Sequence, residues 1–309
     1  LQHDLANAIG EQSCCHDYRL FLCSSGAEAN ENALKLASFH TDKARIIAFD
    51  HAFHGRTSAA VAATDNPSIN APLNQQQKVT FLPFNDEKAL ENELKKGDVC
   101  AVIFEAIQGV GGLDEPSEAF VYAMERLCNE YSACLIADEV QAGFGRTGTF
   151  FAYQKYRIEP HIICMAKGMG NGFPVGGILV HPSIEAKYGM LGTTFGGNHL
   201  ACAASLAVLD VLKEEKLQAH AKDLGEYFYQ KAQNIDGVKL IKGRGLMLGL
   251  EFDFEVGPLR KELIYTHRIF TGGSSNKNLL RILPPLTVEQ KHIDFFFTQL
   301  EIALKTIAA

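Results

Sequence analysis

Short apolar segments alternate with helix-length segments between Arg19 and His181, and this rhythm limits what the chain can fold into. The apolar segments read RLFLC, RIIAFD, VTFLPF, CAVIFEA, CLIADEV, HIICMAK and GGILVH. Alternation of this kind is typical of an α/β sheet. Because the segments are continuously apolar, we expect strands that are covered on both faces and therefore mostly parallel. Ligands are then expected at the carboxyl ends of the strands.

The pattern changes after a long helical stretch over 199–234. Fewer strand-like segments follow, VKLIKGRGLMLGLEF and NLLRILPPL, and a helical pattern over 288–307 closes the chain. We therefore predict a large domain over 1–210 and a smaller C-terminal α+β domain over 211–309. No Pro/Ser-rich linker separates the two, so the boundary is not sharply marked.

Charge and apolar content narrow the class of partner. The 309 residues are 47% hydrophobic and carry a formal net charge of -7, which gives no electrostatic reason to bind nucleic acid or an acidic membrane. No apolar stretch reaches the roughly 20 residues that cross a bilayer. The eight cysteines are scattered without a CxxC pair, as in reduced core positions. We expect a cytoplasmic protein whose partners are small molecules, with no nucleic acid and no membrane.

The beginning of the chain has helical periodicity from its first residue. The segment LQHDLANAIG starts at Leu1 without a preceding turn or cap. We expect that an N-terminal segment is missing.

A strand followed directly by a helix forms the first chemical signal, in LFLCSSGAEANENALKLA. Gly26 permits close approach of the backbone, Ser25 can cap the helix, and the helix N-terminus favours an anion such as phosphate. The same residues also fit a plain capping box, in which Ser25 pairs with Glu28. Taken alone, the motif leaves both interpretations open.

The second signal is the apolar strand CLIADEV, which ends in Asp138 and Glu139. A buried carboxylate needs a cationic partner, and a protonated pyridine nitrogen is one such partner. A salt bridge to an arginine such as Arg146, or a solvated strand end, would serve equally well.

The third signal is Lys167, which ends the apolar segment HIICMAK 29 residues after Asp138 and precedes a glycine-rich turn. Burial lowers the pKa of a lysine and suits it to form a Schiff base. A lysine that extends to solvent is the alternative. Strand-end Asp138 and Lys167 together with a phosphate-type turn form a set that dinucleotide binding does not explain, because the glycines do not follow G-x-G-x-x-G into a helix.

These residues also carry a family resemblance. SSGAEANENALKLA, HAFHGRT, EAIQGVGG, IADEVQAGFGRTG, AKGMGNGFPVG, GTTFGGN and LLRILPPLT occur in the order typical of class III aminotransferases, over nearly the whole chain. Among these enzymes the chain most resembles the acylornithine and ornithine aminotransferases. The resemblance implies pyridoxal phosphate (PLP) fold type I, pyridoxal 5'-phosphate as cofactor, and a homodimer with shared active sites.

The resemblance also implies a role for individual residues. Lys167 would bind the cofactor covalently and Asp138 would pair with its ring nitrogen. The expected cofactor-binding residues are Ser25, Gly26 and Ala27 at the phosphate, Phe53 and Val140 on the two ring faces, Gln141 near the ring hydroxyl, and Thr194 at the phosphate of the neighbouring subunit. The expected substrate-binding residues are Arg56, Glu105 and Arg281, of which the arginines suit carboxylates; surface arginines and a structural glutamate are the alternatives.

One position departs from the family pattern in a way that bears on substrate binding, and one pair of histidines needs separate mention. Ornithine-type members of the family commonly have a glutamate at the position of Val110, where it pairs with the arginine that Arg281 matches. We therefore expect Arg281 to stay available for a carboxylate in both half-reactions. His51 and His54 have a spacing that could suggest a metal, but no third ligand is evident nearby, so no metal is predicted.

The function that the resemblance implies is transfer of the terminal amino group of N-acylornithine, acetyl or succinyl, to 2-oxoglutarate in arginine biosynthesis. Ornithine, 4-aminobutyrate or another ω-amino acid is the alternative donor. From other classes, an inactive PLP-binding scaffold and a nicotinamide-dependent oxidoreductase remain to be distinguished.

Overall fold

The seven apolar segments form the seven strands of one sheet in the computed structural model, which describes residues 1–185 and 187–308. The strands are β1 (Arg19–Cys23), β2 (Arg45–Phe49), β3 (Val79–Leu82), β4 (Val99–Phe104), β5 (Cys134–Asp138), β6 (Ile162–Met165) and β7 (Gly176–Val180). Their order across the sheet is β1-β7-β6-β5-β4-β2-β3. Neighbours from β6 to β3 pair in parallel, whereas β7 is antiparallel to both β6 and β1. The expected mostly parallel α/β sheet is confirmed.

Helices cover both faces of this sheet. They are α1 (Gln2–Ser13), α2 (Gly26–Thr41), α3 (Ser58–Ala62), α4 (Glu87–Leu94), α5 (Glu118–Glu130) and α6 (His199–Glu214), with short 3-10 helices η1 (Pro67–Ile69), η2 (Asn74–Gln76), η3 (Ala152–Tyr156) and η4 (Lys167–Met169). Alternate strand residues enter two apolar clusters: Phe49 of β2 joins the cluster with α1, α5 and α6, and its neighbour Ala48 joins the cluster with α2. The central strands are therefore buried on both faces.

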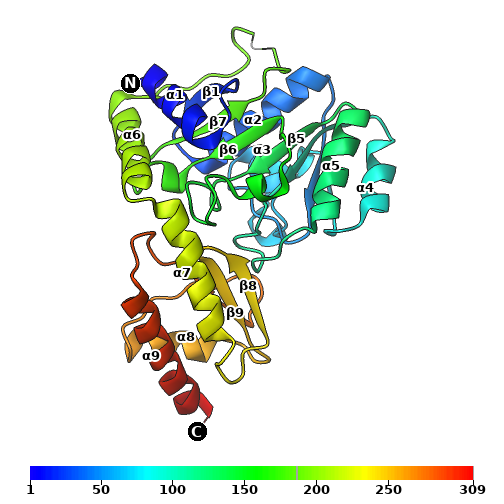
Figure 1. Ribbon diagram of the computed structural model, residues 1–309. Coiled ribbons are helices and arrows are strands. Elements are labelled where there is room, and N and C mark those ends of the chain that lie inside the picture. Colours follow the sequence, from blue (N-terminus) through cyan, green and yellow to red (C-terminus); the bar gives the residue numbers. More distant parts are fainter. Residues whose placement is uncertain (186, 309) are drawn as a thin grey trace.

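A second, antiparallel sheet follows in the C-terminal part. It has the order β10-β9-β8 and consists of β8 (Leu240–Arg244), β9 (Met247–Glu251) and β10 (Leu279–Ile282). It packs with α7 (Leu217–Ala232), α8 (Gly257–Tyr265) and α9 (Gln290–Ala308) around a third apolar cluster. Figure 1 shows the large sheet and the N-terminus at one end of the molecule and this smaller unit with the C-terminus at the other.

The long helical stretch expected over 199–234 is two helices. Lys216 adopts the left-handed conformation, with φ 52°, between α6 and α7. In Figure 1, α7 continues from α6 toward the small sheet. The predicted domain boundary near 210 stays a prediction.

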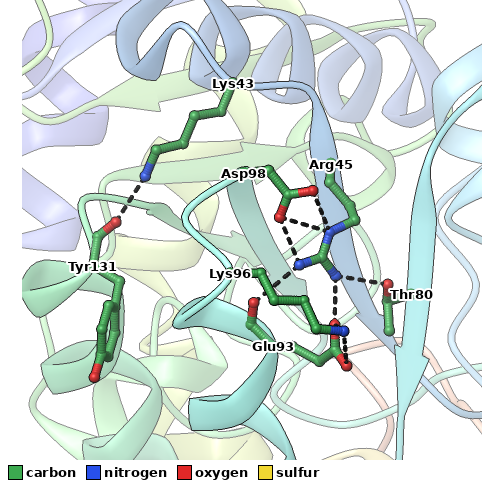
Figure 2. A network of polar contacts seen from close by, with 7 residues as sticks. All are labelled: Lys43, Arg45, Thr80, Glu93, Lys96, Asp98 and Tyr131. Atoms are coloured by element: carbon green, nitrogen blue, oxygen red, sulfur yellow. Dashed lines mark hydrogen bonds and ion pairs between the residues drawn. The ribbon is translucent and has the colours of Figure 1, made fainter.

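An arginine network lies at the start of β2, beside the edge strand β3 of the large sheet (Figure 2). Arg45 at the start of β2 forms ion pairs of 2.7 Å with both Glu93 of α4 and Asp98, and it donates to the Thr80 hydroxyl of β3 at 2.9 Å. One guanidinium thus joins two strands and the end of a helix.

All eight cysteines are free, and seven of them are buried, as expected for reduced core positions. Within the described part of the chain, every helix is too short or too polar to cross a membrane.

Candidate active site

A cavity of about 460 Å³ lies where β5 and β6 end and α2 begins. Its size is that of a small-molecule site. Most of the residues predicted to bind cofactor or substrate line it, namely Ser25, Gly26, Ala27, Phe53, Arg56, Glu105, Asp138, Val140, Gln141 and Lys167. The fold therefore brings together side chains from segments that lie far apart in the sequence.

The N-terminus of α2 forms one wall of this cavity. The Ser25 hydroxyl accepts a hydrogen bond from the Glu28 N–H at 3.2 Å, and the Glu28 carboxylate accepts one from the Ser24 N–H at 2.8 Å. A Cβ at Gly26 would lie 2.5 Å from the Val140 side chain, so the close approach of these segments requires glycine. The first N–H groups of the helix and its dipole favour an anion at this wall. The capping interaction and an anion site are therefore compatible here.

Asp138 ends β5 with only 5% of its surface exposed. Its Oδ2 accepts hydrogen bonds from Asn30 Nδ2 at 2.7 Å and His54 Nδ1 at 2.8 Å, and its Oδ1 accepts one from the Val140 N–H at 3.0 Å. Hydrogen bonds to the ionised form stabilise the carboxylate. The alternative partner, Arg146, does not contact Asp138 but donates to backbone carbonyls.

Asn30 and His54 are site residues that the sequence analysis did not assign. Asn30 lies one helical turn after Gly26 on α2, so the same face of the helix carries both, and this spacing was the available signal. His54 follows Phe53 directly, and its side chain is fully buried. Its Nε2 is buried without a hydrogen-bond partner in the described chain. Because an ionised carboxylate only accepts, Nδ1 must carry the proton that faces Asp138.

Glu105 is buried beneath the cavity and holds two loops. One carboxylate oxygen accepts from the Phe53 N–H at 3.0 Å and the other from the Gly109 N–H at 2.9 Å. Burial, with a further contribution from the charge of Asp138, raises the pKa of Glu105 to about 7, although His54 opposes the shift. A buried carboxyl with such a pKa can hold a proton near neutral pH.

Glu139 follows Asp138 in sequence but serves another contact. Its two oxygens accept hydrogen bonds from the Ala152 and Tyr153 N–H groups at the start of η3, both at 2.8 Å. Burial raises the pKa of Glu139 to about 7. This carboxylate anchors the loop that carries Val140 and Gln141.

Lys167 projects from a strained turn. β6 ends at Met165, Ala166 is extended, and Lys167 adopts a positive φ of 46° as the first residue of η4. Such a conformation is unfavourable for a residue with a Cβ, and it directs the chain away from the line of β6 at this position. The turn presents the lysine side chain to the cavity.

A second cavity, of about 720 Å³, adjoins the first and shares Gln141 and Lys167 with it. Arg281 of β10 lines this second cavity and donates to the Gly109 carbonyl and, at 3.2 Å, to the Gln141 side chain. Burial and the nearby charge of Arg260 lower the pKa of Arg281. No carboxylate of the described residues forms an ion pair with this guanidinium, which leaves it able to bind an anion.

Thr194 is the predicted residue that does not line either cavity. It is exposed, and it lies beside Phe195, which is 73% exposed. Its predicted contact with a neighbouring subunit stays a prediction. No cluster of metal-ligating side chains occurs among the described residues, which include His51 and His54.

Comparison with known families and proteins gives a consistent result. The family model described as "Aminotransferase class-III" matches residues 1–304. An acetylornithine aminotransferase of Methanosarcina acetivorans is 38% identical over 287 residues, which are 92% of this chain and 72% of that protein. An acetylornithine aminotransferase of Bacillus subtilis is 41% identical over 280 residues, 89% of this chain and 72% of that protein.

Solved structures have the same fold. The ornithine aminotransferase of Toxoplasma gondii superposes with a TM-score of 0.91 at 27% identity, over 100% of this chain and 77% of that one. An S-selective transaminase from Arthrobacter sp., solved with alanine bound, superposes with a TM-score of 0.89 at 25% identity, over 99% of this chain and 80% of that one.

Proposed function

Since this chain belongs to the class III aminotransferases, which are PLP-dependent enzymes of fold type I, we propose that it transfers the terminal amino group of an N-acylornithine to 2-oxoglutarate. The observation that carries the proposal is the position of Lys167 and Asp138 in one cavity with the N-terminus of α2. The relatives named acetylornithine aminotransferase support the donor. Membership of this family argues against the alternative function, that of a nicotinamide-dependent oxidoreductase.

The described residues fit the cofactor. Gly26 leaves space beside Val140 that a side chain would fill, and the α2 N-terminus suits a phosphate. Asp138 is a buried carboxylate at the cavity wall, as a protonated ring nitrogen requires. Phe53 and Val140 would flank the ring and Gln141 would lie near its hydroxyl. When bound, pyridoxal 5'-phosphate supplies an electron sink for the carbanion that forms when the substrate loses a proton.

The chain's own groups would carry the remaining chemistry. Lys167 would hold the cofactor until the donor amine displaces it, and its Nζ would then take the proton from the substrate carbon and deliver it to the cofactor. Arg281 and Arg56 would bind substrate carboxylates, because a guanidinium fork suits bidentate recognition. Glu105 would support this arrangement by fixing Phe53 and the Gly109 loop.

Val110 bears on how the enzyme would handle two substrates. Its carbonyl accepts hydrogen bonds from the Ser275 N–H at 2.9 Å and hydroxyl at 3.2 Å, so the loop is fixed while its apolar side chain offers Arg281 no charge. We infer that Arg281 serves a carboxylate in both half-reactions and that other contacts select the donor.

Replacing Val110 by Glu would test this inference. The new carboxylate would compete for Arg281, and we expect the KM for 2-oxoglutarate to rise about five-fold. Val110→Gln, with similar length and no charge, is the matched control and should change KM less. An unchanged KM in Val110→Glu would show that Arg281 does not bind the acceptor in this way.

Arginine biosynthesis in the cytoplasm is the setting that this reaction implies, and we propose a homodimer in which Thr194 reaches the neighbouring subunit's cofactor phosphate. Sedimentation of the active enzyme tests the assembly, because an active monomer would contradict it.

The donor can be identified from the absorption band of the bound cofactor. The enzyme with PLP is mixed separately with N-acetylornithine, N-succinylornithine, ornithine and 4-aminobutyrate, and the rate of bleaching is measured. We expect an acylated ornithine to react fastest, and Lys167→Ala to show no turnover with any donor. The Toxoplasma gondii neighbour makes ornithine the second candidate. If only ornithine or 4-aminobutyrate reacts, the acylornithine assignment is wrong although the family stands.

A further inference from the structure

Arg146 lies in the loop after β5 and reaches two separate segments of the small unit. Its guanidinium donates to the Leu246 carbonyl at 3.2 Å, in the turn between β8 and β9, and to the Pro284 carbonyl beyond β10. The Arg146 carbonyl in turn accepts from the Leu246 N–H at 2.9 Å. One residue of the large unit therefore holds the small unit at two points.

The partners of Arg146 distinguish it from the other cations between the two units. Arg244 and Lys242 form ion pairs of 2.8 Å with Glu115 and Asp114. Arg146 has no carboxylate partner among the described residues, and burial lowers its pKa. An arginine kept half-buried on neutral carbonyls contributes less Coulomb attraction than an ion pair would, but its planar fork fixes the direction of each carbonyl.

The two carbonyls flank the strands that position Arg281. Pro284 comes three residues after Arg281, just beyond the end of β10 at Ile282. Leu246 immediately precedes β9, whose Gly249 pairs with Arg281. Arg146 also lines the same cavity as Arg281. Arg146 therefore contacts the chain on both sides of the strand pair that carries Arg281, whose guanidinium also contacts Gly109 and Gln141.

We propose that Arg146 is a positioning residue that sets the place of Arg281 and thereby the affinity of the enzyme for the substrate carboxylate. The proposal rests on the proposed function, in which Arg281 binds that carboxylate. It predicts an effect on substrate affinity that exceeds the effect on turnover, because Arg146 acts through Arg281 and not on Lys167.

The test compares Arg146→Met and Arg146→Lys with the parent enzyme, each protein being assayed with the cofactor bound. We expect Arg146→Met to raise the KM for 2-oxoglutarate about ten-fold, because a displaced Arg281 binds the carboxylate less tightly, with kcat changed about three-fold or less. Arg146→Lys can still donate to one carbonyl and should restore part of the affinity. Arg244→Met is the matched control, since it removes a contact between the units without touching the segment around Arg281.

A double variant separates positioning from general support. If Arg146 acts only through Arg281, the double variant Arg146→Met with Arg281→Met should have nearly the same KM as Arg281→Met alone. If the two residues act independently, the fold-increases in KM of the two single variants should multiply. Hydrogen exchange gives a readout that does not need activity: the amides of 279–287 should exchange faster in Arg146→Met and in Arg146→Lys, and not in Arg244→Met.

Three results would overturn the proposal: equal effects of Arg146→Met and Arg244→Met on KM, multiplicative effects in the double variant, or unchanged exchange over 279–287. If Arg281→Met itself leaves the KM unchanged, the proposed role of Arg281 fails. If Arg281→Met raises KM and neither Arg146 variant does, only the positioning role fails.

Discussion

The two neighbouring acidic residues at the end of β5 make different contacts. Asp138 lies at the cavity, where Asn30 and His54 donate to it, and Glu139 accepts two backbone N–H groups at the start of η3. A buried strand end thus carries one carboxylate that faces the cavity and one that holds a loop. Because burial dominates at Glu139, its protonation state is coupled to folding.

The stability of the protein should depend on pH through Glu139. Burial raises the pKa of this group from an ordinary 4.5 to about 7, so the stabilisation is complete below 4.5 and is lost as pH rises through 7. Glu139→Gln removes the titration. Between pH 4.5 and 8 we expect the free energy of unfolding of the parent to fall by about 3 kcal/mol relative to that of Glu139→Gln.

Urea unfolding at several pH values measures this difference, with both proteins in the same cofactor state. Glu226→Gln on the exposed surface of α7 is the control for loss of one carboxylate. Parallel pH curves for the parent and Glu139→Gln would contradict the assignment.

Single residues of the site could be predicted where they break an apolar pattern. Asp138 and Lys167 were visible because each ends a run of apolar residues. Asn30 and His54 were not assigned, because their importance lies in a contact with Asp138 across 108 and 84 positions of sequence. Proximity of that kind is decided by the order of strands in the sheet.

At the scale of elements, the network around Arg45 shows how one side chain can hold a sheet edge (Figure 2). Lys96 adds an ion pair of 2.7 Å to Glu93, and Asp98 accepts from Arg45 through both oxygens. The hydrogen bond with Arg45 lowers the pKa of Asp98. The C-terminal end of α4 is thereby joined to the first residue of β2.

Arg45→Met should destabilise the fold, because it leaves Glu93 and Asp98 without their shared cation. The Arg45 side chain is 11% exposed and donates to both carboxylates, and we expect a loss of about 2 kcal/mol in the free energy of unfolding. Arg126 is the matched control: it also pairs with two carboxylates, Glu87 and Glu130, but is 56% exposed. Arg126→Met should cost less than about 1 kcal/mol. Equal losses in the two variants would refute the argument from burial.

The strands could be predicted from the sequence more completely than the helices. A run of apolar residues bounded by polar ones predicts a buried strand, and each of the seven expected runs contains one. No glycine or proline marks the break at Lys216 in the sequence. The break arises because α6 packs in the cluster of the large sheet and α7 in the cluster of the small one. α8, a helix of only nine residues between two strands, was also not predicted from the sequence.

At the scale of the whole molecule, the two units meet where backbones touch. A Cβ at Gly225 of α7 would lie 2.3 Å from the Gly245 carbonyl oxygen, and one at Gly245 would lie 2.5 Å from the Thr147 backbone. Gly245 also has a positive φ of 55°. Helix, hairpin turn and loop therefore pack in one stack without side chains between them.

Gly225→Ala should reverse the usual effect of removing a glycine from a helix. Alanine normally stabilises a helix interior by about 1 kcal/mol, but here the added methyl group meets the Gly245 backbone, and we expect a net loss of about 2 kcal/mol. Gly10 of α1 is the matched control, since its Cβ would meet nothing nearer than 3.4 Å. Thermal unfolding should show a lower Tm for Gly225→Ala and an unchanged or higher Tm for Gly10→Ala. A stabilised Gly225→Ala would show that α7 can move away from the turn between β8 and β9 at no cost.

The place of β1 in the sheet has a consequence for how the protein is made. β1 pairs only with β7 in the large sheet, with Arg19 opposite Val180. A growing chain on the ribosome must therefore hold β1 without its β7 partner until β7 has emerged, and α2, whose N-terminus forms one wall of the cavity, waits with it. The cavity is thus completed late in translation, and the exposed edge of β1 is the segment that a nascent-chain chaperone would have most reason to cover.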